Sequence, residues 1–320
     1  MNRLLLAAAL ASLACFSGHA QEESGTLRAA LHEEGLPLDA ANLPNLDQKI
    51  TSGAELDAED QFVVAYYWDD GTGMLNPPLH ILRYERKTRL WEKAEIGNAP
   101  EAGAVADPCY GSVLDVRAFG DGLVIETHIN PSAGCALVVS RELKLAASLD
   151  GWVLGEFSGG TLLYHRSQVH FATVHPAEIA VFDLKSKKDL VIFPPKTETL
   201  VRRNLTAELG EYFKTHRDYC AKANDPCDPR IFDSDLDGKP AIDDRDHALA
   251  FSISYELQGY GQDENKPAGP ASVIYVYRNA NDESKIEFRE FLPDQIKALF
   301  GDVSLQDLLA PERLKAIFER

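Results

Sequence analysis

Four segments of this chain repeat one order of elements, and this repeat constrains the fold more than any other feature of the sequence. Each has an apolar strand, a variable connection rich in Gly, Pro and polar residues, and a second strand, and most continue through a tight charged turn into a third strand. Further strands are predicted ahead of two of the segments, at 112–117 and 152–157. The four segments are 62–96, 123–140, 161–193 and 248–291. Short strands at such spacing predict an all-β centre.

The strands differ in how many of their faces are apolar. Segments 62–67 and 273–277 are apolar on both faces, whereas 90–96 and 286–291 alternate apolar with charged residues. The first pattern is typical of strands covered on both sides, and the second of half-exposed or edge strands. About four small antiparallel sheets packed face to face produce this difference. At the level of architecture the chain therefore resembles a β-propeller-like repeat protein, with a β-sandwich or an irregular β-meander as the alternative.

Helices are expected at the edges of this β-rich centre. Residues 27–34 predict a short helix that stops at Gly35, and a helical insertion is expected at about 197–246. The tail, 293–320, predicts further helices whose apolar residues should pack on the β core. We expect one β-rich domain from 21 to 320, not two domains.

The first twenty residues have the pattern of a signal peptide. Arg3 supplies a positive charge, an apolar stretch runs from Leu4 to Phe16, and Gly18-His19-Ala20 is a small-x-small cleavage site. The stretch is too short to span a bilayer, which needs about 20 apolar residues. We therefore expect an exported protein, periplasmic or extracellular. The alternative is a lipoprotein anchored at Cys15.

Four cysteines remain after cleavage, an even number in a chain directed to an oxidising compartment. Sequence alone allows three pairings. The two local pairs, Cys109–Cys135 and Cys220–Cys227, are favoured here. A zinc site is not indicated, because these cysteines do not form a CxxC pattern.

The formal net charge of −18 argues against two classes of partner. Nucleic-acid binding needs a basic surface to neutralise phosphates, and docking on anionic lipid needs one as well. No second apolar segment is long enough to span a membrane. The classes of partner that remain are a protein of unknown identity and a glycan.

The sharpest motif lies at 233–244, where the sequence reads DSDLDGKPAIDD. Acidic residues at loop positions 1, 3, 5 and 12, with Gly at position 6, resemble the EF-hand-type (DxDxDG) calcium loop. Asp244 replaces the usual Glu, and Pro240 lacks the N–H that paired EF-hand loops use. The resemblance implies a structural calcium site, whose ligands would be Asp233, Asp235, Asp237, Asp244 and the carbonyl of Lys239.

Two hypotheses for function follow, and both involve the variable connections at 68–78, 168–178 and 257–271. If the repeats are blades, these connections emerge at one end and form a ligand face. The first hypothesis is a non-catalytic exported binding or scaffold protein. The second is a secreted or periplasmic hydrolase that uses loop histidines and carboxylates; no motif for a catalytic nucleophile supports it. The expected ligand face comprises Asp69, Asp70, His170, His175, Glu178, Tyr260 and Asp263.

Overall fold

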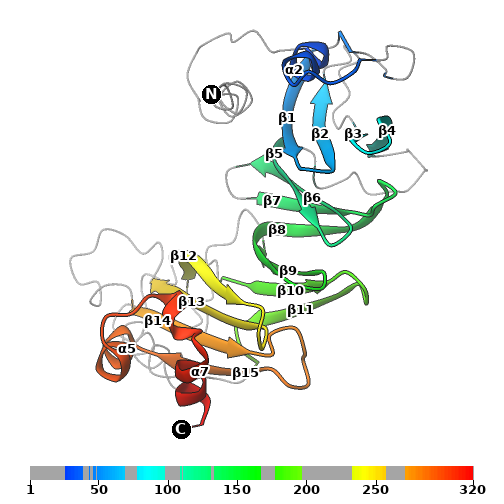
Figure 1. The fold of residues 1–320 in the computed structure, drawn as a ribbon. Helices are drawn as coiled ribbons and strands as arrows, with labels where there is room; N and C mark the ends of the chain where they lie inside the picture. The colour runs from blue at the N-terminus through cyan, green and yellow to red at the C-terminus, as the bar shows by residue number, and fades with distance from the viewer. Residues whose placement is uncertain are drawn as a thin grey trace, which may run out of the picture. The chain divides into compact units, whose positions relative to one another are not determined.

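The computed structural model divides the chain into two compact units, Met1–Trp152 and Val153–Arg320, and each is described by itself. The structure describes residues 26–38, 43, 46–47, 49–68, 78–97, 109, 111–130, 133–166, 177–196, 233–256 and 271–319. The predicted β-rich centre is confirmed, because antiparallel strands account for most of these residues (Figure 1). The expectation of one domain over 21–320 stays a prediction.

Among its described residues, the first unit contains one helix and two groups of antiparallel strands, each in chain order. Helix α2 ends where Gly35 adopts a left-handed conformation (φ 66°), as the sequence predicts. The elements are α2 (Leu27–Glu33), β1 (Ile50–Asp57), β2 (Gln61–Trp68), β3 (Leu79–Glu85), β4 (Leu90–Ile96), β5 (Ser112–Phe119), β6 (Gly122–Asn130), β7 (Ala133–Val139) and β8 (Leu145–Phe157), and the last residues of β8 belong to the second unit.

The second unit repeats the same plan and adds helices at its end. Strands β12 to β15 form a four-stranded antiparallel sheet in chain order. The elements after β8 are β9 (Thr161–Arg166), β10 (Ile179–Asp183), β11 (Lys188–Phe193), β12 (Asp233–Asp243), β13 (Ala248–Glu256), β14 (Ala271–Arg278), β15 (Glu287–Phe291), α5 (Pro293–Phe300), α6 (Leu305–Leu308) and α7 (Pro311–Phe318). In the described part of the chain, no helix is long and apolar enough to cross a membrane.

Burial explains why some strands are apolar on both faces. Strand β2 is buried from Phe62 to Trp68. Its odd-numbered core residues, such as Val63, pack with residues of β5 to β7, and its even-numbered ones, such as Phe62, pack with Leu27 and Leu31 of α2. By contrast β4, the outer strand of the sheet, has only Ile96 fully buried. The predicted distinction between covered and edge strands is confirmed.

The second unit has two corresponding layers. One core lies between β9–β11 and β12–β15, and includes Phe193, which packs edge-on against Phe251 and Tyr275. A second core covers the other face of the last sheet, where Leu308 and Phe318 of the C-terminal helices pack on Ala250 and Val276. The predicted docking of the tail on the β core is confirmed. In each unit the terminal sheet therefore has a helical cover on one face, as capping repeats do.

Two sequence expectations need correction. The described strands form three antiparallel sheets, because β8 is continuous across 145–157 and joins β5–β7 and β9–β11 in one seven-stranded sheet. About four separate small sheets had been expected. In addition, 233–243 is strand β12, the first strand of the last sheet, whereas the sequence had suggested part of a helical and calcium-loop insertion over 197–246. The rest of that insertion, 197–232, lies outside the described residues.

Candidate functional site

We call each run of four consecutive antiparallel strands a module: β1–β4, β5 to the first half of β8, the second half of β8 to β11, and β12–β15. Successive strands of a module run in opposite directions, so its connections fall at two ends. Short connections lie at what we term the turn end. The connections at the opposite end, which we term the loop end, are long except for 131–132. The turn-end connections are 58–60, 86–89, 120–121, 140–144, 158–160, 184–187, 244–247 and 279–286, and those at the loop end are 69–78, 97–111, 131–132, 167–178, 194–232 and 257–270.

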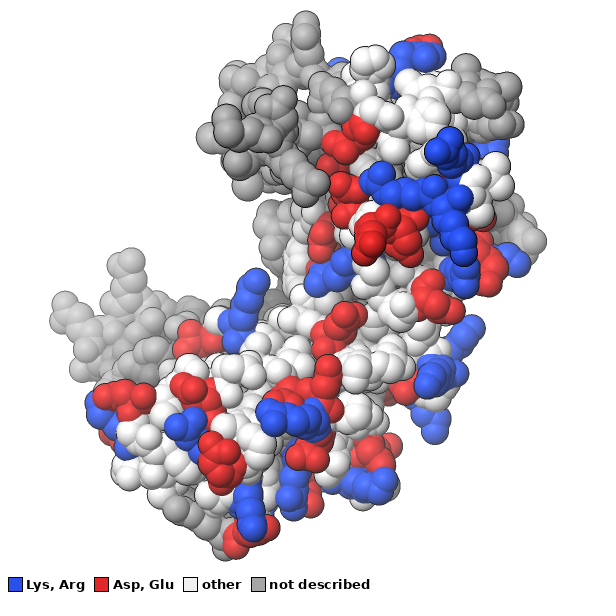
Figure 2. Space-filling model, viewed as in Figure 1, with Lys and Arg blue, Asp and Glu red and all other residues white. Residues whose placement is uncertain are grey.

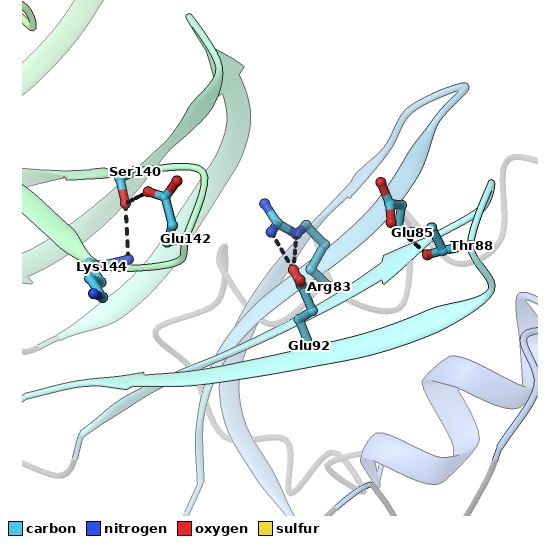
Figure 3. Close-up of polar contacts among 7 residues, drawn as sticks. All are labelled: Arg83, Glu85, Thr88, Glu92, Ser140, Glu142 and Lys144. Carbon is cyan, nitrogen blue, oxygen red and sulfur yellow. Dashed lines mark hydrogen bonds and ion pairs between the residues drawn. The ribbon is translucent and has the colours of Figure 1, made fainter.

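The turn end of the first unit is closed by its own local contacts (Figure 3). Thr88 donates to Glu85 at 2.5 Å, within the turn between β3 and β4. In the turn between β7 and β8, the Ser140 hydroxyl accepts from the Lys144 N–H at 3.3 Å and donates to Glu142 at 3.1 Å. Such short-range hydrogen bonds satisfy polar groups of the turn residues within the turn itself. We therefore assign a structural role to the turn end.

The loop end of the first unit is held together through Cys109. This residue forms a disulfide with Cys135, at the start of β7, which confirms one predicted pair. Its carbonyl accepts hydrogen bonds from the Thr127 hydroxyl at 2.7 Å and from the Tyr67 hydroxyl at 3.5 Å. One residue of the connection 97–111 is thereby tied to the ends of β2, β6 and β7. The second predicted pair, Cys220–Cys227, lies outside the described residues.

An aromatic cluster occupies the loop end of the first module. The Trp68 and His80 rings lie 3.9 Å apart, and Tyr66 stacks on His80 at 5.5 Å. His80 is 5% exposed, and its Nδ1 lies 3.4 Å from the Glu95 carboxylate. Burial lowers the pKa of His80, an effect that Glu95 partly opposes. His80 is therefore a neutral core imidazole at neutral pH.

A second aromatic group lies at the loop end of the next module. Trp152 of β8 lies against Gly134 of β7, and the His128 ring of β6 is 5.6 Å from the Trp152 ring at an angle of 39°. On the same face of β6, two residues before His128, Glu126 is buried and forms an ion pair with Arg117. Trp152 and His128 are both partly exposed to solvent, whereas Trp68 and His80 are buried.

In the second unit, polar residues gather at the loop end of β9. The Ser234 hydroxyl of β12 is buried and accepts from the Ala177 N–H at 2.7 Å, which ties the connection before β10 to the last sheet. His165 is largely buried and its pKa is lowered by that burial. On the opposite face of β9, Arg166 pairs with Asp189 and lies 3.6 Å from Glu178.

Of the expected ligand face, the structure describes only Glu178. Its carboxylate belongs to the ion-pair group around Arg166, where the Tyr164 hydroxyl also donates to Asp189 at 2.8 Å. Burial raises the pKa of Tyr164, so its hydroxyl stays protonated. The other six residues, Asp69, Asp70, His170, His175, Tyr260 and Asp263, lie outside the described residues.

The acidic segment of the calcium motif lies along an exposed strand. Asp235 pairs with Ser254 and Asp237 with Ser252 on β13, so these four side chains share one face of the sheet. Ser234 and Leu236 point to the core face. The register shifts between Asp237 and Ala241, where Gly238 takes a positive φ of 78° and Pro240 has no N–H to donate.

Two of the remaining predicted ligands, Asp244 and Lys239, are not gathered around these aspartates, and the side chain of the third, Asp233, lies outside the described part of the chain. Asp244 lies in the turn after β12, where its carboxylate accepts from the Ser158 N–H at 2.5 Å, and Lys239 is exposed in the irregular stretch. Among the described residues, no group of three or more His, Cys, Asp or Glu side chains is placed to hold a metal ion. The calcium site stays a prediction.

Sequence reasoning missed both Trp152 and His128 as site residues. Their proximity depends on the register between β6, β7 and β8, and the sequence carries no direct signal for that register. The face of the molecule in Figure 2 shows acidic and basic side chains interspersed.

No family model and no curated protein matches this sequence. Among solved structures, the chain is similar to an alpha-L-arabinanase of Penicillium chrysogenum complexed with arabinobiose, at 8% identity and a TM-score of 0.30, covering 75% of this chain and 66% of that one. It is also similar to a GH43 beta 1,3 galactosidase, at 6% identity and a TM-score of 0.25, covering 82% and 50%. A third is a member of the DUF4221 family from Bacteroides vulgatus, at 10% identity and a TM-score of 0.23, covering 75% and 81%.

The chain spans less than two thirds of the length of the first two structures.

Proposed function

We propose that this chain is an exported, non-catalytic binding protein, built as a β-propeller-like array of modules, that recognises a glycan or protein ligand at the loop end of its modules. The observation that carries the proposal is the separation of connections: the long ones all leave the strands at the loop end, and the turn end has only short ones. Long connections on a rigid scaffold are where proteins place recognition residues.

The loop end also has the rigidity that a binding surface needs. In the first unit the Cys109–Cys135 disulfide and the hydrogen bonds to the Cys109 carbonyl fix the strand ends to the connection between modules. In the second unit the buried Ser234–Ala177 hydrogen bond has the same effect. Preorganised ends reduce the conformational entropy lost on binding. The disulfide also supports a location outside the reducing cytosol.

Calcium at the acidic strand is a second part of the proposal. Asp235 and Asp237 lie on one face of β12, and the hydroxyls of Ser254 and Ser252 stand opposite them on β13. Cross-strand neighbours have Cβ atoms about 5 Å apart, so two carboxylates and two hydroxyls supply oxygen to one small region. Calcium takes six to eight oxygen ligands, and water would complete the set. The ion would offset repulsion between the carboxylates.

A glycan array tests the binding function. The mature chain, 21–320, is fluorescently labelled and applied to immobilised neutral and anionic oligosaccharides, and bound sugars are then titrated in solution. We expect binding that the double variant His170→Ala/His175→Ala weakens at least about tenfold, because both histidines lie in a loop-end connection. The matched control, Thr88→Ala/Lys144→Ala, alters two turn-end residues and should bind like the wild type.

Two results would count against this function. If the turn-end variant loses affinity while the loop-end variant keeps it, the recognition surface has been assigned to the wrong end. If a bound oligosaccharide is cleaved, as measured by new reducing ends, the protein is a hydrolase, and the non-catalytic assignment fails.

A further inference from the structure

Trp152 rests on a glycine that no other residue could replace without moving the indole. A methyl group on Gly134 would come within 2.4, 2.5 and 2.6 Å of three atoms of the Trp152 ring. Real Cβ contacts are never this short, so the indole lies directly against the backbone of β7. Gly134 is buried, whereas Trp152 itself is partly exposed. A glycine thus allows the indole to lie close against the sheet.

The strands that support this indole are anchored on both sides. Gly134 precedes Cys135, which is joined to Cys109 by the disulfide. His128 follows Thr127, which is completely buried and donates to the Cys109 carbonyl at 2.7 Å. Gly134 and His128 are therefore each next to a residue fixed to Cys109. The position of the ring is set before any ligand arrives.

Polar groups adjoin the indole on the same face of the sheet. The His128 ring, 5.6 Å away and tilted by 39°, has nitrogen atoms that accept or donate hydrogen bonds. The Glu126 carboxylate further along β6 is neutralised by its ion pair with Arg117. The local surface thus combines a flat apolar ring with a polar imidazole and no uncompensated charge at Glu126.

We propose that Trp152 and His128 form a subsite for a neutral sugar ring, which stacks on the indole while His128 hydrogen-bonds a hydroxyl. This inference rests on the proposed binding function and names the ligand class of its loop end. A pyranose has an apolar face of C–H groups and an edge of hydroxyls, which matches an aromatic platform beside a polar side chain.

Charge favours a neutral sugar over an anionic one. The chain carries a net charge of −18, so its field repels polyanions such as uronic-acid polymers and nucleic acids. The carboxylate nearest to the platform on β6 is already paired with Arg117. Hydrogen bonding and stacking therefore provide the recognition of the sugar. The affinity of the protein for the sugar should then depend little on salt concentration.

The experiment uses mature full-length protein and three neutral probes: cellohexaose, xylohexaose and mannohexaose, with an oligogalacturonide as the anionic comparison. Binding is measured by calorimetry and by the change in tryptophan emission. We expect at least one neutral probe to bind, Trp152→Ala to weaken it about tenfold or more, and Trp152→Phe to retain most of the affinity. Trp91→Phe, on β4 and in contact with Tyr84 and Pro37, is the control and should bind as the wild type does.

Emission separates contact with the sugar from a structural role. The ligand-induced change in the wild type should persist in Trp91→Phe and disappear in Trp152→Phe, although the latter still folds and binds. The sugar subsite is wrong if Trp152→Phe keeps the full emission change. It is also wrong if Trp152→Ala binds like the wild type while His170→Ala/His175→Ala loses affinity. In either case the proposed binding function of the loop end stands. If the array yields only an anionic or protein ligand, the sugar subsite is likewise overturned. If neither the array nor the neutral probes bind, both proposals fail.

Discussion

Trp152 covers Gly134 so closely that its indole occupies the space of the missing side chain. This contact joins β7 to the middle of β8, at the loop end of the first unit. It explains a glycine within a strand, a position where glycine is usually unfavourable because it contributes no packing.

Gly134→Ala tests that contact. The added methyl group must displace the indole, because it would lie 2.4–2.6 Å from three ring atoms. Overpacking of this kind typically costs about 1–3 kcal/mol, and we expect a loss of unfolding free energy in that range by urea denaturation. Gly155→Ala is the matched control. Its methyl group would be 2.3 Å from only the terminal Cδ1 of Ile242, which can rotate away, so a smaller loss is expected. Equal losses would refute this account.

Reduction of the Cys109–Cys135 bond should destabilise the first unit. The bond closes a loop with a sequence separation of 26 residues. In the chain-entropy account a loop of this length stabilises by about 3.5 kcal/mol. The double variant Cys109→Ala/Cys135→Ala should therefore lower the urea midpoint and the melting temperature. The comparison variant Cys220→Ala/Cys227→Ala separates this effect from that of the other two cysteines. An unchanged midpoint after removal of Cys109 and Cys135 would contradict the prediction.

Many of the strands could be predicted because they carry their own evidence in the sequence. Apolar runs such as 62–67 and alternating runs such as 90–96 reflect burial on two faces or on one, and the turns between them contain charged residues and glycine. The chain-end helices were also predictable, since their apolar residues need cover. The continuity of β8 was not, because Asp150-Gly151 has the composition of a turn, and a strand passes through it.

The acidic segment shows how two patterns compete within one sequence. Asp235-Leu236-Asp237 fits a calcium loop by the spacing of its carboxylates, and it fits a strand by its period of two. The buried Ser234 and partly buried Leu236 on the core face favoured the strand.

The Trp152–His128 pair was beyond prediction for a different reason. It requires the β6–β7–β8 register, which includes irregularities after His128 and at Val138–Val139.

Glu55→Gln should stabilise the protein above neutral pH. Burial, followed by repulsion from Glu34 and Asp57, raises the pKa of Glu55 to about 7. An acid whose pKa is raised on folding stabilises most below its unfolded value, near 4.5, and loses this contribution as pH rises through about 7. At pH 8 the neutral amide avoids that loss, and we expect a gain of about 1–2 kcal/mol after solvent screening. Urea midpoints from pH 4 to 8 measure it. Glu59→Gln, on the adjacent turn, is the control, and the same gain there would remove the assignment to Glu55.

Calcium should raise the melting temperature of the mature chain, and Asp235→Ala/Asp237→Ala should abolish the rise. In the absence of calcium, the double variant should be no less stable than the wild type, because it removes two exposed carboxylates that repel each other along β12. Scanning calorimetry in 2–5 mM CaCl₂ and in chelator measures both effects, at concentrations that suit about a millimolar extracellular site.

Asp302→Asn removes an exposed carboxylate elsewhere in the second unit and should preserve the rise in melting temperature. Magnesium at the same concentration tests selectivity, since it demands tighter octahedral geometry than a flat sheet face offers. A wild-type melting temperature that ignores calcium would rule out the site.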